Sequence, residues 1–123
     1  MTKKVLVVDD EPSITELAKI KLTHDGFDVA TANSGEEALA QVAGERPDVI
    51  VLDVMMPGMT GWEVARRLKE DPATKGIPIL MLTALGLPEE HVPGFADIDE
   101  YYTKPFEPST LVKMVRRLAR RSD

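Results

Sequence analysis

The chain has 123 residues, of which 43% are hydrophobic, and it contains no cysteine. This length suits one domain, which we expect over residues 1–123, and the lack of cysteine excludes a disulfide framework or a thiolate metal site. The net charge of −6 disfavours nucleic-acid binding, and no apolar run is long enough for a membrane span or signal peptide, so we expect a cytoplasmic protein.

Short β-branched runs alternate along the chain with segments in which apolar residues recur at i, i+3 and i+4. This alternation is typical of repeated βα units and a parallel sheet. A first strand is expected over residues 5–8 and a weaker one over residues 28–32. The helix between them ends before Gly26, and its expected inner face consists of Ile14, Leu17, Ala18 and Leu22.

Two capping boxes mark the starts of the next two helices. Ser34 is followed three residues later by Glu37, and Thr60 by Glu63, so each pair can satisfy the free N–H groups of a first turn. The expected inner faces are Ala38, Leu39, Val42 and Ala43 in the first of these helices, and Val64, Ala65 and Leu68 in the second.

Three further strands are expected over residues 49–52, 79–82 and 101–103. The run at 49–52 is apolar throughout, which predicts a central strand buried on both faces. A last helix is expected from about Pro108 to Arg120, with an inner face of Leu111, Val115, Leu118 and Ala119. The fold class is therefore α/β with a parallel sheet.

Polar residues follow these strands at the point where each ends: Asp9, Asp10, Asp53, Thr83 and Lys104. In a parallel sheet such side chains meet at the carboxyl edge, where α/β folds bind ligands. An Asp-Asp pair alone is often a helix cap and a Lys-Pro pair is often a turn, but their coincidence at four strand ends favours a site. Carboxylates this close would repel each other unless a hard cation such as Mg²⁺ joined them, and one could act as a nucleophile toward phosphorus.

Four segments carry a family resemblance: VLVVDDEP at residues 5–12, VIVLDVMMPGMTG at 49–61, ILMLTA at 79–84 and YYTKPF at 101–106. Together they resemble the receiver domain of two-component response regulators, of the chemotaxis type. The resemblance implies a flavodoxin-like sheet of five parallel strands in the order 2-1-3-4-5, with helices on both faces. It covers almost the whole chain.

The same resemblance implies roles for the acidic residues. Asp53 is the phosphoacceptor. Asp10 and Asp53 bind Mg²⁺ directly, Asp9 binds it through water, and the backbone carbonyl of Met55 is a further ligand. Mn²⁺ can replace Mg²⁺ in such a site.

The remaining implied roles concern the phosphoryl group and the signal. Lys104, next to a cis peptide bond with Pro105, pairs with the phosphoryl oxygens, and Thr83 and the N–H of Ala84 hydrogen-bond to them. Tyr101 is the aromatic residue that turns inward when Thr83 moves. The implied phosphodonor is a sensor histidine kinase or histidine phosphotransfer protein, with an unidentified output partner downstream.

The leading hypothesis is therefore a phosphorylation-dependent switch, a monomer or weak dimer, that is not an enzyme in the ordinary sense. A receiver-like interaction module that never accepts phosphate is the alternative. A phosphoaspartyl hydrolase would need a second Asp where Met55 stands, and a flavin protein would need a Gly-, Ser- or Thr-rich loop where residues 9–13 are acidic.

The stretch between Leu85 and Tyr101 departs from the family pattern. Related receivers have a full fourth helix here, but Pro93 and Gly94 fall inside it, and each disfavours a helix interior. We expect this helix to be short or irregular.

Overall fold

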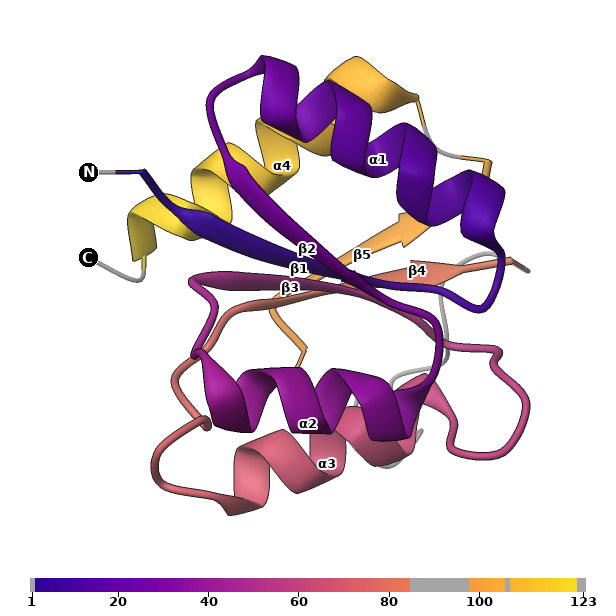
Figure 1. Ribbon diagram of the computed structural model, residues 1–123, viewed down its shortest axis with the longest axis vertical. Helices are drawn as coiled ribbons and strands as arrows, with labels where there is room; N and C mark the ends of the chain where they lie inside the picture. Colours follow the sequence, from indigo (N-terminus) through magenta and orange to yellow (C-terminus); the bar gives the residue numbers. More distant parts are fainter. Residues whose placement is uncertain (1, 85–97, 106, 122–123) are drawn as a thin grey trace.

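The computed structural model describes residues 2–84, 98–105 and 107–121. Within them, five parallel strands form one sheet in the order β2-β1-β3-β4-β5 (Figure 1). The α/β class and the strand order expected from the sequence are both confirmed. The strands are β1 (Lys4–Val8), β2 (Asp28–Ala32), β3 (Val49–Asp53), β4 (Ile79–Thr83) and β5 (Glu100–Thr103).

Four helices in the described part of the chain cover the two faces of the sheet. They are α1 (Pro12–His24), α2 (Gly35–Gly44), α3 (Gly61–Glu70) and α4 (Pro108–Arg121). Helices α1 and α4 lie on one face, and α2 and α3 on the other (Figure 1). The short or irregular helix expected before β5 falls in residues 85–97, outside the described residues.

The central strand β3 is buried on both faces, as its unbroken apolar sequence predicts. All five of its residues are buried, and the side chains of Val49 and Val51 join the core under α1 and α4 while those of Ile50 and Leu52 join the core under α2 and α3. Parallel sheets need this double cover because their crossover helices occupy both faces. Asp53 is therefore the last residue of a strand that is shielded from solvent on both faces.

Both predicted capping boxes begin a helix at the expected residue. The Ser34 hydroxyl accepts a hydrogen bond from the Glu37 N–H at 3.1 Å, and the Thr60 hydroxyl accepts one from the Glu63 N–H at 3.3 Å. Each bond satisfies one of the free N–H groups of a first turn. The caps place the starts of α2 and α3 beside the carboxyl edge of the sheet.

Two residues assigned to inner helix faces lie outside. Leu17 is 46% exposed, and Ala43 is exposed. In both helices the buried residues recur at i, i+3 and i+7, and a residue next to this narrow stripe turns toward solvent. In α1, Thr15 is buried, and its hydroxyl donates to the Pro12 carbonyl at 3.1 Å.

Candidate functional site at the carboxyl edge of the sheet

The predicted site residues come together at one edge because the strands share a direction and a register. Asp53 is the last residue of β3 and Thr83 the last residue of β4, while Asp9 and Lys104 directly follow β1 and β5. Lys104 is fixed to the neighbouring strand, since its backbone N–H donates to the Thr83 carbonyl at 2.6 Å. All four residues therefore lie at the same edge of the sheet.

Three carboxylates form an acidic cluster, which consists of Asp9, Asp10 and Asp53. One oxygen from each lies within 4.8 Å of the others. Asp9 is fully buried and Asp53 is 3% exposed, whereas Asp10 is the most open of the three. Oxygen-only ligands on a partly open site suit a hard divalent cation that keeps several of its waters.

The ammonium of Lys104 bridges two members of the cluster. Its Nζ lies 2.8 Å from Asp9 Oδ2 and 3.1 Å from Asp53 Oδ1. Burial on its own lowers the pKa of Lys104, but its hydrogen bonds to Asp9 and Asp53 outweigh that effect and raise the pKa above the usual value. Lys104 is therefore a fixed positive charge at this edge.

The pKa of Asp53 is also raised. Burial is the largest cause, the negative charge of Asp9 is the second, and the bond with Lys104 only partly opposes them. When burial and a neighbouring negative charge raise the pKa of a carboxyl group, its charged form is stabilised by any further cation placed beside it. The site thus has an electrostatic reason to bind a divalent metal at Asp53.

Asp9 is held at four of its atoms. Its N–H donates to the Ala32 carbonyl at 3.1 Å, its carbonyl accepts from the side-chain amide of Asn33 at 3.1 Å, and its Oδ1 accepts from the Glu11 N–H at 3.0 Å. The fourth atom is Oδ2, which accepts from Lys104. Asn33 was not predicted from the sequence as part of the site, although it follows β2 just as the recognised site residues follow their strands.

The remaining predicted residues differ in how far they are exposed. Thr83 is buried, with 6% of its surface exposed, whereas Ala84 and Met55 are exposed. Tyr101 is half-buried, and its ring lies 6.2 Å from the ring of Trp62 at the start of α3. The aromatic pair belongs to the face covered by α2 and α3.

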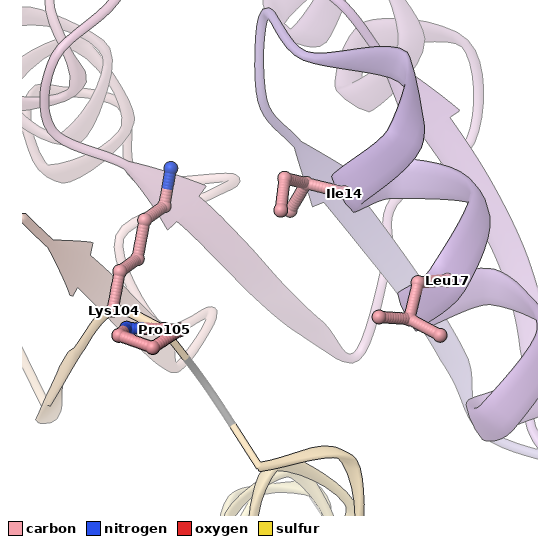
Figure 2. A pocket seen from close by; sticks show the side chains of 4 residues that line it. All are labelled: Ile14, Leu17, Lys104 and Pro105. Atoms are coloured by element: carbon pink, nitrogen blue, oxygen red, sulfur yellow. The ribbon is translucent and has the colours of Figure 1, made fainter.

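An apolar pocket adjoins the site between α1 and the turn after β5. Ile14 and Leu17 face Lys104 and Pro105 across it, and the ammonium of Lys104 extends away from Pro105 (Figure 2). The peptide bond between Lys104 and Pro105 is cis, as the resemblance implied. The stem of Lys104 thus forms part of the pocket wall while its charged end reaches the acidic cluster.

The chain also matches known proteins. The family described as "Response regulator receiver domain" matches residues 5–116, which include all five polar strand-end residues. The chain belongs to this family. It is therefore a receiver of the kind used in two-component signal transduction, which is not a class of ordinary enzymes.

Individual relatives agree with this assignment. The alkaline phosphatase synthesis transcriptional regulatory protein PhoP of Bacillus subtilis is 46% identical over 124 residues, covering 100% of this chain but 51% of its own length. Chemotaxis protein CheY4 of Vibrio cholerae superposes with a TM-score of 0.89 at 41% identity, covering 96% of this chain and 99% of that one. The BeF3-activated DrrB receiver domain has a TM-score of 0.83 at 36% identity, covering 98% and 99%.

This receiver spans about half the length of the curated relatives named for DNA binding or transcriptional regulation. The likeness therefore concerns their receiver portion. In the part of this chain that the structure describes, none of the helices has the length and apolar character needed to cross a membrane.

Proposed function

We propose that this receiver is a phosphorylation-activated switch in which Asp53 accepts a phosphoryl group from a phosphohistidine. The supporting observation is the bridge that Lys104 makes between Asp9 and Asp53 within a cluster of three carboxylates. It places a cation next to the one carboxylate that ends the central strand. That cation can neutralise the oxygens of a transferring phosphoryl group.

In the proposed transfer, a carboxylate oxygen of Asp53 attacks the phosphorus of the donor. The P–N bond to the donor imidazole breaks, and the imidazole leaves with the bonding electron pair. An acyl phosphate forms on Asp53, and Lys104 moves from the carboxylates to the phosphoryl oxygens. Thr83 and the N–H of Ala84 donate to those same oxygens.

Mg²⁺, or Mn²⁺ in its place, would be held by the carboxylates of Asp10 and Asp53, by the carbonyl of Met55 and, through water, by Asp9. Both oxygens of Asp9 already accept hydrogen bonds, from Glu11 and Lys104, which favours an indirect role for this residue. When bound, the metal supplies charge neutralisation between the acceptor and the incoming phosphate.

The signal would leave the site through Thr83 and Tyr101. Thr83 ends β4, and Tyr101 stands opposite Met81 in the register of β4 and β5. A shift of Thr83 toward the phosphoryl group would open space for the Tyr101 ring, now packed beside Trp62. The output partner would read this rearranged edge of the sheet.

The alternative is a receiver-like interaction module that works without phosphorylation, and one experiment separates the two. The protein is incubated with acetyl phosphate and Mg²⁺, and its intact mass is measured. We expect the mass of one phosphate to be added to the wild type and not to Asp53→Asn. An unmodified wild type would favour the interaction module, and an Asp53→Asn protein that gains the same mass would place the acceptor elsewhere.

A further inference from the structure

We infer that Asn33 is a positioning residue for the metal site, acting through the backbone of the acidic pair at the end of β1. This inference rests on the proposed function, because it concerns how the receiver holds Mg²⁺. Asn33 itself contacts neither the metal nor the phosphoryl group in this assignment. Its side-chain amide donates to the carbonyl of Asp9 at 3.1 Å.

The register between β1 and β2 explains why a side chain is needed there. Val8 pairs with Ala32, and the ladder continues one bond further, from the Asp9 N–H to the Ala32 carbonyl. In a parallel ladder the next donor would be the N–H of Ser34, opposite the Asp9 carbonyl. At Ser34 the chain turns into α2 as its N-cap, and the Asn33 amide supplies the bond to Asp9 from the side chain.

The hydrogen-bonded carbonyl belongs to the peptide unit that joins Asp9 to Asp10. Because a peptide unit is planar, fixing its oxygen fixes the direction in which the chain enters Asp10. Asp10 is the most open member of the acidic cluster and a proposed direct metal ligand. Asn33 therefore controls where the Asp10 carboxylate stands relative to Asp53.

Asn33 is itself held in place from α2. Its backbone N–H lies 3.4 Å from a carboxylate oxygen of Glu37, the residue whose own N–H is bound by the Ser34 cap. The junction between β2 and α2 thus holds Asn33 in position, and Asn33 in turn holds the carbonyl of Asp9. An exposed polar loop residue acquires a defined role in the geometry of the buried carboxylates.

Gln41, a residue of α2, offers a matched control. Like that of Asn33, its side-chain amide donates to a backbone carbonyl, here that of Thr31 in β2, at 2.7 Å. This bond has the same chemistry as the Asn33 bond, but its acceptor is no part of the metal site. Substituting either residue by alanine removes one amide-to-carbonyl hydrogen bond, and Gln41→Ala also removes a longer bond, at 3.4 Å, to the carboxylate of Glu37.

The test compares Asn33→Ala and Gln41→Ala by Mg²⁺ titration calorimetry, by urea unfolding and by amide NMR of the metal-free protein. We expect Asn33→Ala to weaken Mg²⁺ affinity about fivefold, the factor that corresponds to one lost neutral hydrogen bond. It should also shift the amide signals of Asp10 and Glu11 before any metal is added. Gln41→Ala should lose similar stability and keep the wild-type affinity. Asn33→Leu, which keeps the size of the side chain without a donor, should behave as Asn33→Ala does.

Two outcomes would overturn the role of Asn33 while leaving the proposed function intact. One is an Asn33→Ala protein that binds Mg²⁺ as tightly as a metal-binding wild type. The other is a Gln41→Ala protein that loses as much affinity as Asn33→Ala. A wild type that binds no Mg²⁺ would overturn the metal site and the positioning role together.

Discussion

At the scale of single residues, the site is a set of buried carboxylates whose repulsion is reduced by one lysine. Asp53 shows the remaining imbalance most clearly, because its pKa stays raised although Lys104 lies 3.1 Å away. Folding therefore brings together charges that the unfolded chain keeps apart. The repulsion between these charges has measurable consequences for stability and for metal affinity.

Replacing Asp53 with asparagine should stabilise the metal-free protein at neutral pH. A carboxyl whose folded-state pKa is raised contributes stability at low pH, and that contribution is lost as the pH rises through the raised pKa. At pH 7 the ionised Asp53 thus destabilises the fold, and Asp53→Asn should increase the free energy of unfolding by on the order of 1 kcal/mol. Urea denaturation at a series of pH values measures this.

The stability gained by Asp53→Asn should decrease as the pH falls toward 3.8, the ordinary pKa of this carboxyl group. Asp28→Asn is the matched control, because Asp28 is exposed at the opposite end of the sheet. It should change stability little at any pH. An Asp53→Asn protein less stable than the wild type at pH 7 would contradict the explanation.

Removing the ammonium of Lys104 should strengthen Mg²⁺ binding. The ammonium is an internal counter-ion for Asp9 and Asp53, so a metal must share these carboxylates with it. We expect Lys104→Ala to bind Mg²⁺ several-fold more tightly in calorimetry, because it removes a like charge only a few ångströms from the metal site. Its phosphorylated form should nevertheless fail to signal. Weaker Mg²⁺ binding by the variant would show that Lys104 orders the carboxylates more than it competes for them.

At the scale of elements, the sequence predicted what depends on periodicity and local capping. The unbroken apolar run of β3, the caps at Ser34 and Thr60, and the inner face of α4 all follow from short-range rules and are all confirmed. The convergence of polar strand ends was predictable for the same reason, since parallel strands share one carboxyl edge.

The sequence did not predict features that depend on fine rotation of a helix or on long-range hydrogen bonds. Leu17 is apolar but exposed, because α1 has more apolar residues than its contact stripe can bury. The bond from Asn33 to Asp9 joins residues 24 positions apart, and only the strand register reveals it. The short or irregular helix expected between β4 and β5 stays a prediction.

Gly61, the first residue of α3, should tolerate no side chain. A Cβ at this position would lie 2.2 Å from the Asp53 carbonyl oxygen and 2.9 Å from the Val54 Cα, so the backbone itself would have to move. The Gly61 N–H also donates to the Val54 carbonyl at 2.9 Å, which ties α3 to the end of β3. We expect Gly61→Ala to lower the free energy of unfolding by about 2 kcal/mol or more, as overpacking does.

Gly44, the last residue of α2, is the matched control for this change. A Cβ added there meets nothing within 4 Å. Gly44→Ala should therefore leave stability unchanged or raise it by up to about 1 kcal/mol through helix propensity. Equal effects of the two substitutions in chemical denaturation would show that the close approach at Gly61 is relieved without cost.

At the scale of the whole molecule, metal binding and folding should be coupled, because the acidic cluster is assembled from two strands that meet only in the folded state. A ligand that binds only the folded protein stabilises it by mass action, by about 2.7 kcal/mol at a concentration 100 times its Kd. Mg²⁺ should therefore raise the Tm, and K⁺ at equal ionic strength should not.

Asp10→Asn should remove most of this Mg²⁺-dependent rise in Tm, because it deletes a proposed direct ligand from the open side of the cluster. Differential scanning calorimetry with and without Mg²⁺ measures the difference for both proteins. A rise of equal size in the wild type and in Asp10→Asn would place the metal elsewhere.

The two ends of the described chain lie away from the acidic cluster. β1 begins at Lys4, and α4 ends at Arg121, whose guanidinium contacts Asp99 at 3.0 Å just before β5 begins. The start of β1 and the end of α4 lie on the same side of the molecule (Figure 1). The start of β1 and the end of α4 therefore lie at the amino edge of the sheet, on the side opposite Asp53. A sample immobilised on a sensor chip through either end should present its carboxylates to the flowing solution, so kinetic measurements with a phosphodonor protein can be made without blocking the site.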